Sequence, residues 1–234
     1  MQHVIESRQR RRRRVVKQVD FQEHWAYEPV PGNDNVKTPL HEERLDAVTA
    51  KLLDSGAATV LDLGGGSGAL LRRLVAEEQF ARVLGIDTSA EALLRAERRL
   101  EAESDGGGPE WSLQHGSFTE PDESWAAFDV AAMVETIEHV PAEHLSRVER
   151  SVFTVTRPRV VVMTTPNREH NELYGLAEGE LRHPDHEFEW CRSKFRVWAT
   201  GVAERNGYEV AFEDVGRADP LLGSPTQMGV FRLQ

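Results

Sequence analysis

The sequence is poor in cysteine, in long apolar runs and in positive charge. Its 234 residues include one cysteine, Cys191, so no disulfide can form within the chain. No apolar run approaches the roughly 18 residues of a membrane span. The basic start MQHVIESRQRRRRRVV is not followed by the apolar stretch of a secretory signal. Together these absences predict a cytoplasmic protein with no membrane partner.

Acidic residues outnumber basic ones, and the formal net charge is -11. A protein that wraps duplex nucleic acid usually presents a basic face. The excess of acid therefore argues against extensive duplex binding, but it is compatible with an enzyme that grips only the end of a strand. Positive charge is dense at Arg8 and at residues 10–14. We interpret this run as a solvated tail; a phosphate-binding arm and a targeting signal are the alternatives.

Helical and strand-like patterns alternate along the chain after residue 38. Residues 21–38 are rich in Pro, Gly and Asn, so we expect a basic, partly irregular extension over residues 1–38 and one domain over residues 39–234. Helical patterns cover residues 40–53, 68–78, 89–103, 141–155 and 193–207. Ser89 is placed to cap the third of these helices, and Gly207 is expected to end the last. Short runs rich in β-branched residues predict strands at 58–65, 82–87, 111–118, 128–134, 159–165, 208–215 and 228–234.

Strands that alternate with helices predict a mostly parallel sheet with helices on both faces. No helix separates the last two strands, which predicts an antiparallel edge. From about Leu40 to its end the chain resembles the class I S-adenosylmethionine-dependent methyltransferase fold, whose strand order is usually 3-2-1-4-5-7-6. The expected fold class is therefore α/β, with a Rossmann-like, seven-stranded, mostly parallel sheet.

A glycine-rich loop, DLGGGSG, joins the first predicted strand to a helix. Glycines let the backbone approach a ligand closely and adopt positive φ. The loop lacks the G-x-G-x-x-G spacing of an NAD site and resembles the first methyltransferase motif. An acid at the end of the second strand can accept hydrogen bonds from ribose hydroxyls, and in this fold family a residue after the third strand contacts adenine. The resemblance implies S-adenosylmethionine bound by Asp62, Gly64, Gly66, Gly68, Asp87 and Ser117. A different nucleotide and a degenerate site are the alternatives.

The stretch ETIEHV follows the fourth predicted strand. On a helical turn Glu135, Glu138 and His139 would share one face, as metal ligands do. Ligands of open α/β sheets bind beyond the carboxyl ends of strands where the strand order switches, so we expect these residues beside the cofactor's methyl group. A solvated helix face is one alternative, and the "EHV" of metal-free methyltransferases is another.

Two further stretches, TTPNREHN at 164–171 and LRHPDHEFEWCRSKF at 181–195, follow the fifth predicted strand. Together with ETIEHV and an early PLHEERL, they resemble the small-RNA 3′-terminal ribose 2′-O-methyltransferases of the HUA-ENHANCER type. The signatures of that family are E-x-x-E-H, T-P-N-x-E-x-N and D-H-x-F-E-W. His170 departs from the family by replacing a usual aromatic, and Cys191 replaces a frequent threonine.

The resemblance implies four metal ligands that are also the catalytic residues: Glu135, Glu138, His139 and His186. Ligation by nitrogen and oxygen together suits Mn²⁺, Co²⁺ or Fe²⁺ better than Mg²⁺, although abundance favours Mg²⁺ in a cell. We expect His183 to be a loop histidine that packs against Trp190 or Phe188, with only a weak claim to be the general base. We expect Asp185 to shape a turn or to orient a ligand.

A divalent metal lowers the pKa of a bound hydroxyl, and the vicinal hydroxyls of a 3′-terminal ribose suit its open coordination sites. The predicted function is metal-dependent transfer of a methyl group from S-adenosylmethionine to the 2′-hydroxyl of an RNA 3′ end with free 2′,3′-hydroxyls. The resemblance implies small-RNA protection, or RNA repair beside an end-healing kinase-phosphatase. The alternatives are a metal-independent small-molecule methyltransferase and a non-catalytic RNA-end binding module.

Basic and aromatic side chains surround the predicted acceptor loops. Arg168, Arg182 and Arg192 are candidates to meet the last phosphates of an RNA strand. Trp190 and Phe188 could stack on a base, but we expect them to pack in the core.

Overall fold

A seven-stranded sheet organises the computed structural model, which describes residues 39–103 and 108–234. The strand order is β3-β2-β1-β4-β5-β7-β6. The strands are β1 (Thr59–Leu63), β2 (Arg82–Asp87), β3 (Glu110–His115), β4 (Val130–Val134), β5 (Val160–Pro166), β6 (Tyr208–Val215) and β7 (Thr226–Leu233). Strands β1 to β5 pair in parallel, whereas β7 runs antiparallel to both β5 and β6. The predicted fold class and strand order are confirmed.

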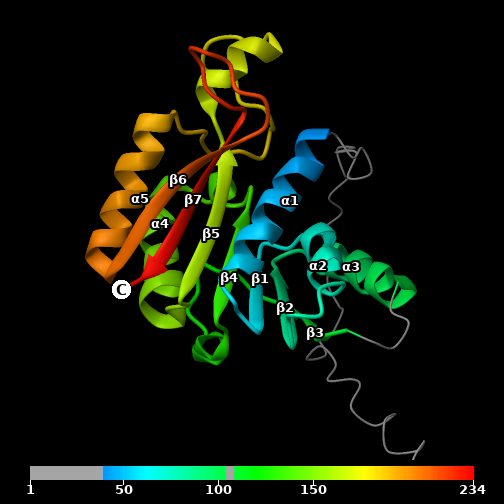
Figure 1. Cartoon of the computed structure of the whole chain (residues 1–234). Helices are drawn as coiled ribbons and strands as arrows, with labels where there is room; N and C mark the ends of the chain where they lie inside the picture. Colours follow the sequence, from blue (N-terminus) through cyan, green and yellow to red (C-terminus); the bar gives the residue numbers. More distant parts are fainter. Residues whose placement is uncertain (1–38, 104–107) are drawn as a thin grey trace, which may run out of the picture.

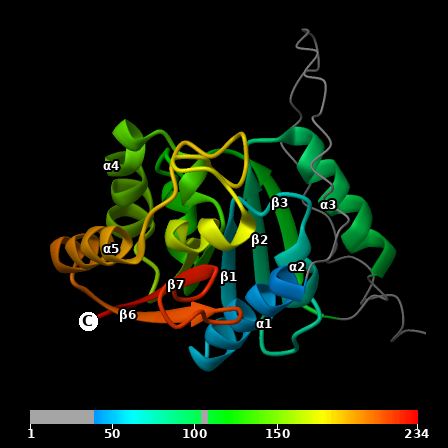
Figure 2. The same cartoon turned by 90° about the horizontal axis from the view of Figure 1, so that it is seen from above.

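Helices cover both faces of this sheet (Figures 1 and 2). The α-helices are α1 (Pro39–Asp54), α2 (Ala69–Leu74), α3 (Ala90–Glu103), α4 (Leu145–Val148) and α5 (Arg192–Asn206). Short 3-10 turns are η1 (Glu123–Ala127), η2 (Ile137–His139), η3 (Ala142–His144) and η5 (Arg168–Tyr174), and η4 (Glu149–Thr156) is a π-helix. Helices α1, α2 and α3 pack on one face, and α4, η4 and α5 on the other.

The strands at the centre of the sheet are buried because helices cover them from both sides. Every residue of β5 is buried, as expected for a parallel strand whose two faces both meet the core. In β1, Val60 joins the cluster under α1, while Leu61 and Leu63 join the cluster under α5. The sheet therefore separates two hydrophobic cores, and at its centre only the ends of the strands are open to a ligand.

Some of the helix ends predicted from the sequence agree with the structure, and one does not. The amide of Ala92 donates to the hydroxyl of Ser89 at 3.2 Å, which confirms the predicted cap of α3. Gly207 ends α5 at a φ of 74°, also as predicted. Helix α2 ends at Leu74, four residues early. There the amides of Ala76 and Glu77 each bond a carbonyl three residues back, which tightens the chain before it turns into β2.

Several predictions concern residues beyond the described ranges. The arginine run at Arg8 and residues 10–14 and the irregular stretch over 21–38 lie there. The N-terminal extension therefore stays a prediction. Within the described ranges, no helix combines the length and apolar character needed to cross a membrane.

Asp129, just before β4, ties the start of that strand to the start of β1. Its Oδ2 atom accepts hydrogen bonds from the amides of Ala58 and Thr59 at 2.9 and 3.0 Å and from the Thr59 hydroxyl at 3.1 Å. The Asp129 amide in turn donates to that hydroxyl at 2.8 Å. Burial by itself would raise the pKa of Asp129, but these hydrogen bonds outweigh it and lower the pKa.

We expect Asp129→Ala to lower the free energy of unfolding by about 1–2 kcal/mol near pH 7, because hydrogen bonds to a partly exposed carboxylate are lost. A lowered pKa means that the carboxylate stabilises the fold above about pH 4 and loses this effect as the pH falls through the folded-state pKa. Urea unfolding of wild type and variant at neutral and acidic pH measures both effects. The exposed Asp214→Ala is the matched control, and equal stability of Asp129→Ala and wild type at neutral pH would contradict the prediction.

Candidate active site

The loops that follow β1 and β4 touch at the edge of the sheet where the strand order switches. Gly64 has a φ of 80°, and a Cβ atom there would lie 2.5 Å from the Cγ2 atom of Thr136. No larger residue fits between the two loops. The glycine loop and ETIEHV therefore form one continuous site, although 66 residues of chain lie between Gly68 and Glu135.

The glycine loop is held against the end of β2. The amides of Gly64 and Gly65 donate to the Ile86 carbonyl at 2.8 and 3.0 Å. The Gly66 amide donates to Asp87 Oδ2 at 2.8 Å, and the Ser89 amide donates to Asp87 Oδ1 at 2.8 Å. Each carboxylate oxygen keeps a lone pair for another donor. Asp87 thus shapes the loop and remains able to accept from a ligand.

Asp62 lies beneath the same loop and is buried, with 2% of its surface exposed. Its Oδ2 atom has no hydrogen-bond partner among the described residues. Burial, reinforced by the nearby charge of Asp87, raises the pKa of Asp62 to about 7. An unpaired buried carboxyl is costly unless a ligand supplies a donor or the group binds a proton.

The remaining predicted cofactor residues border this loop. A Cβ atom at Gly68 would lie 2.9 Å from Ala96 Cβ, so this glycine allows α2 and α3 to pack closely. Open space lies beside Gly66. After β3, the Ser117 hydroxyl is 2.7 Å from that of Thr119 and accepts from the Thr119 amide at 3.2 Å. A contact between Ser117 and adenine remains a prediction.

ETIEHV does not form the single helical turn that its spacing predicts. Glu135 adopts a φ of 52°, in the left-handed region, and only residues 137–139 are helical, as η2. The cause is the sheet: the Glu135 amide still bonds the Thr164 carbonyl of β5 at 3.1 Å, and the chain must turn sharply after it. The expectation of three ligands on one helical face was therefore wrong for Glu135.

Glu135 instead faces α1, where it forms an ion pair with Arg44 at 3.1 Å. Its Oε1 atom is buried and has no hydrogen-bond partner among the described residues. Arg44 also donates to the Thr226 hydroxyl of β7 at 3.0 Å. The ion pair therefore links α1, β7 and the ETIEHV turn.

Three of the predicted ligands come together. Glu138, His139 and His186 each offer a ligand atom, and these atoms lie within 4.8 Å of one another. Glu138 is fully buried; its Oε2 atom accepts from the Thr165 hydroxyl at 3.1 Å, whereas its Oε1 atom has no partner among the described residues.

Burial, followed by the charge of Glu135, raises the pKa of Glu138 well above its ordinary value. Glu135 and Glu138 each have one buried carboxyl oxygen without a partner among the described residues. A cation would compensate the charge of these two groups. Glu138, His139 and His186 therefore fit a divalent metal.

Both imidazoles have one nitrogen fixed by a hydrogen bond. His186 Nδ1 lies 2.6 Å from Glu189 Oε1, and His139 Nδ1 lies 3.1 Å from the Asp185 carbonyl oxygen. A carboxylate and a carbonyl can only accept, so Nδ1 carries the hydrogen in each ring and Nε2 is the nitrogen free for a metal. The backbone carbonyl of Asp185 makes the contact with His139. This agrees with the prediction that Asp185 orients a ligand.

Glu189 is the residue that the sequence reasoning missed. It is buried, and it also accepts from the Arg182 amide at 2.7 Å and from the Asn171 side chain at 2.5 Å. Burial by itself would raise the pKa of Glu189, but hydrogen bonds from His186, Asn171 and Arg182 outweigh it and lower the pKa. Its position three residues after His186 within DHEFEW was the available signal.

His183 lies with the other histidines, and its ring pairs are with His139 and His186 rather than with Trp190 or Phe188 as expected. Its ring centroid is 6.0 Å from that of His139 and 5.5 Å from that of His186. Its Nδ1 atom accepts from the Asp185 amide at 3.1 Å, so Nε2 carries the hydrogen in the neutral ring. This tautomer cannot take a proton through Nε2, which weakens the case for His183 as a base.

Two of the three arginines proposed for RNA phosphates are used inside the protein. Arg182 donates to Asn171 Oδ1 and to the carbonyls of Asn167 and Pro225. Arg192 pairs with Glu169 at 2.6 Å and donates to the Leu221 carbonyl. These guanidinium groups fasten the loops after β5 and β6 to one another. Arg168, in contrast, is exposed.

The aromatic residues of the same segment divide as expected. Trp190 is buried in the core, with 2% of its surface exposed, and its ring stacks on Phe188 with centroids 4.5 Å apart. Phe188 is partly buried and packs against the same core. This confirms the prediction that both residues belong to the core.

Sequence comparison relates the chain to known enzymes. A family model described as a methyltransferase domain matches residues 60–159. The small RNA 2′-O-methyltransferase of Rattus norvegicus is 33% identical over 205 residues, which cover 84% of this chain and 52% of the rat protein. The chain thus spans about half the length of this curated relative.

Comparison with solved structures relates the chain to the same enzymes. The methyltransferase domain of bacterial CtHen1 is 39% identical, with a TM-score of 0.74 over 83% of this chain and 100% of that one. The structure of the small RNA methyltransferase HEN1 is 29% identical, with a TM-score of 0.80 over 85% of this chain and 26% of that one. The shared fold is that of class I S-adenosylmethionine-dependent methyltransferases. The chain belongs to the small RNA 2′-O-methyltransferase family and corresponds to the methyltransferase domain of its members.

Proposed function

We propose that this chain transfers a methyl group from S-adenosylmethionine to the 2′-hydroxyl of the 3′-terminal ribose of RNA, and that it requires a divalent metal. The observation that carries the proposal is the cluster of Glu138, His139 and His186 directly beside the glycine loop. Family membership supports RNA as the acceptor. The setting, in small-RNA protection or in repair beside an end-healing kinase-phosphatase, stays a prediction, as does a cytoplasmic location.

The cofactor site proposed here consists of the glycine loop and the acids around it. The residues are Asp62, Gly64, Gly66, Gly68, Asp87 and Ser117. Asp87 would accept from the ribose hydroxyls through its remaining lone pairs, while its bonds to the loop amides keep it in place. The unpaired Oδ2 atom of Asp62 lies under the loop as a further acceptor.

The proposed metal ligands are the Nε2 atoms of His139 and His186 and the carboxylate of Glu138. Glu135 completes the set because its unpaired Oε1 atom can serve a metal while Oε2 keeps its ion pair with Arg44. This mixture of nitrogen and oxygen suits Mn²⁺ or Co²⁺, with Mg²⁺ as the abundant competitor. When bound, the metal would lower the pKa of the 2′-hydroxyl and favour a ribose with both hydroxyls free.

The chain's own groups would prepare this site before the substrate binds. Glu189 and the Asp185 carbonyl hold both imidazoles with Nε2 unprotonated. Burial, followed by the charge of His186, lowers the pKa of His139, which keeps this ring neutral at physiological pH. Thr165 fixes one oxygen of Glu138 and leaves the other free. Ligands held in one geometry reduce the ordering that binding requires.

For the cofactor site, we expect Asp87→Ala to weaken S-adenosylmethionine binding by about 1–3 kcal/mol, because hydrogen bonds to a charged group are lost. Isothermal titration calorimetry measures the affinity, with Asp214→Ala as a control far from the glycine loop. Unchanged affinity in Asp87→Ala would remove Asp87 from the ribose site.

For the metal site, we expect His186→Ala to abolish methyl transfer and Mn²⁺ binding, with S-adenosylmethionine affinity nearly unchanged. Glu189→Gln removes the charge that holds His186 Nδ1–H, so it should weaken Mn²⁺ binding by roughly 10–100-fold. Calorimetry with Mn²⁺ alone gives a readout that does not depend on activity.

His144→Ala, outside the cluster, is the matched control and should behave as wild type. Methyl transfer that survives in EDTA would show that the metal mechanism is wrong, and would favour a metal-independent enzyme. Tight RNA binding without transfer in added Mn²⁺ would instead indicate a non-catalytic module.

The whole proposal is tested on RNA ends. Incubation with labelled S-adenosylmethionine, Mn²⁺ and a short RNA ending in a 2′,3′-diol should make the 3′ end resistant to periodate. A 3′-deoxy end keeps the nucleophile but loses one contact to the metal site, so kcat/KM should fall at least about 100-fold. A 2′-deoxy end is the negative control. Equal single-turnover rates on the diol and 3′-deoxy ends would show that the site does not read the 3′-hydroxyl.

A further inference from the structure

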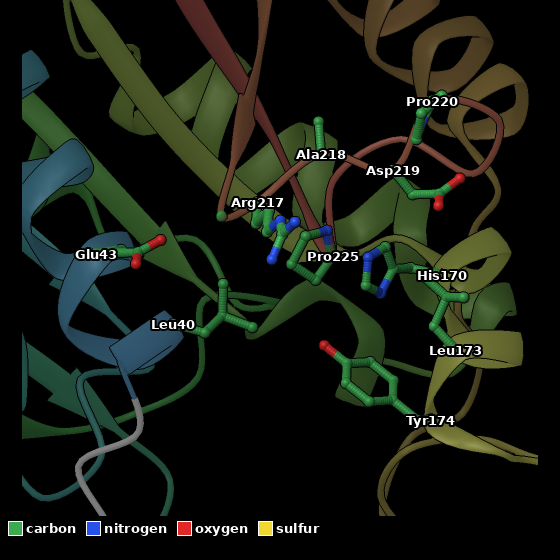
Figure 3. Close-up of a pocket in the computed structure, with 11 residues that line it drawn as sticks. Leu40, Glu43, His170, Leu173, Tyr174, Arg217, Ala218, Asp219, Pro220 and Pro225 are labelled. Atoms are coloured by element: carbon green, nitrogen blue, oxygen red, sulfur yellow. The ribbon is translucent and has the colours of Figure 1, made fainter.

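A groove of about 490 Å³ lies between the start of α1, the η5 turn and the loop that joins β6 to β7 (Figure 3). Ligand pockets in proteins usually measure roughly 300–1,000 Å³, so there is room for a purine. The residues that carry the argument are Leu40, His170, Leu173, Tyr174, Arg217 and Pro225. The proposed metal and cofactor residues do not line this groove.

The walls combine a planar ring with apolar side chains. Tyr174 and Leu173 are 50% and 54% exposed, which is high for large apolar groups that face a hollow. The Arg182 guanidinium lies 5.0 Å from the centre of the Tyr174 ring. Since Arg182 is itself fastened to the carbonyls of Asn167 and Pro225, it supports the ring from one side. Tyr174 is therefore a supported platform with exposed surface.

His170 supplies an unpaired polar group at the same place. Its residue surface is 8% exposed, and its Nδ1 atom has no hydrogen-bond partner among the described residues. Figure 3 shows its imidazole turned toward the groove, 5.3 Å from the Tyr174 ring between centroids. Burial, followed by the charge of Arg182, lowers the pKa of His170, so its ring is neutral and keeps one nitrogen as a hydrogen-bond acceptor. Buried polar atoms are usually paired, so this one points to a ligand.

The charges around the groove do not suit a phosphate. Among the described residues that line the groove, Arg217 is accompanied by Glu43 and Asp219, so acids outnumber basic side chains there. A neutral, flat heterocycle with polar edges fits such a lining better than an anion does. Single-stranded RNA is bound through this kind of contact, with bases stacked on aromatic rings and their edges hydrogen-bonded.

A short series of residue contacts connects the groove to the cluster of Glu138, His139 and His186. His170 lines the groove, and the next residue, Asn171, donates to Glu189, which in turn holds His186. Arg182 reaches both sides, since it supports Tyr174 and donates to Asn171. A strand whose terminal ribose lies at the cluster therefore has this groove within reach of an upstream nucleotide.

We propose that this groove is a nucleobase subsite, in which Tyr174 stacks on an unpaired base upstream of the acceptor ribose and His170 hydrogen-bonds to its edge. The inference rests on the proposed function, because it takes RNA as the substrate. The site selects a single-stranded 3′ end, since a base within a duplex cannot enter the groove.

The test is a thermodynamic cycle between the protein and the RNA. Short single-stranded RNAs carry one abasic nucleotide at successive positions near the 3′ end, and their affinities are measured for wild type and for Tyr174→Leu. In wild type, one position should lose about tenfold in affinity or more when its base is removed. In Tyr174→Leu that loss should nearly vanish, because the base has no ring to stack on. His170→Phe, which keeps a ring but not the hydrogen bond, should retain most of the loss.

The control is Leu221→Ala, which removes an 83% exposed side chain from the neighbouring loop and should keep the full abasic loss. Thermal unfolding of each variant checks that the fold is kept. Equal abasic losses in wild type and Tyr174→Leu at every position would overturn the subsite. If wild type still methylates the diol RNA, the proposed function survives that result; if wild type neither binds nor methylates RNA, the proposed function fails first.

Discussion

The parallel pairing of β1 with β4 is the constraint on which the rest of the molecule depends. It brings two loops from distant parts of the sequence to one edge of the sheet, where Gly64 and Thr136 leave no space for a side chain between them. At the opposite end, Asp129 fastens the starts of the same two strands. Because both ends of the pair are fixed, the glycine loop and the ETIEHV turn face each other at close range.

Several carboxyl groups are buried around this strand pair, and not all of their oxygens are paired with a hydrogen-bond donor or a positive charge. Glu189 is matched by three donors, and Glu135 by Arg44. Among the described residues, Glu138 and Asp62 each keep an oxygen without a partner, and so does Glu135 through its Oε1 atom. Buried polar groups of this kind lower stability unless a ligand compensates them. These unpaired carboxyl oxygens lie on both sides of the contact between Gly64 and Thr136. Asp62 lies under the glycine loop, where we expect the cofactor, and Glu138 lies in the ETIEHV turn, where we expect a cation.

The loops beyond β5 and β6 form a second layer that holds this arrangement. Asn167 donates to the carbonyls of Leu222 and Ser224, and Gln227 donates to those of Pro166 and Trp190. Arg182 continues the network toward Tyr174. Consequently the support of a proposed metal ligand and the shape of the neighbouring groove share the same side chains. If the terminal ribose binds at the cluster and an upstream base binds in the groove, as proposed, the same side chains would help to position both.

Sequence patterns alone determined the order of the elements, the glycine loop and the end of α5 at Gly207, because hydrophobic periodicity and glycine placement act over a few residues. The strand order of the sheet was implied by the resemblance to the class I methyltransferase fold. The DHEFEW motif brought His186 into the predicted site from a distant loop. Only the tertiary structure decided that Glu135 turns toward Arg44, that Arg182 and Arg192 serve as internal fasteners, and that His183 joins the histidines. These outcomes depend on which remote segments meet and which partners they offer a charge, and no local spacing records that.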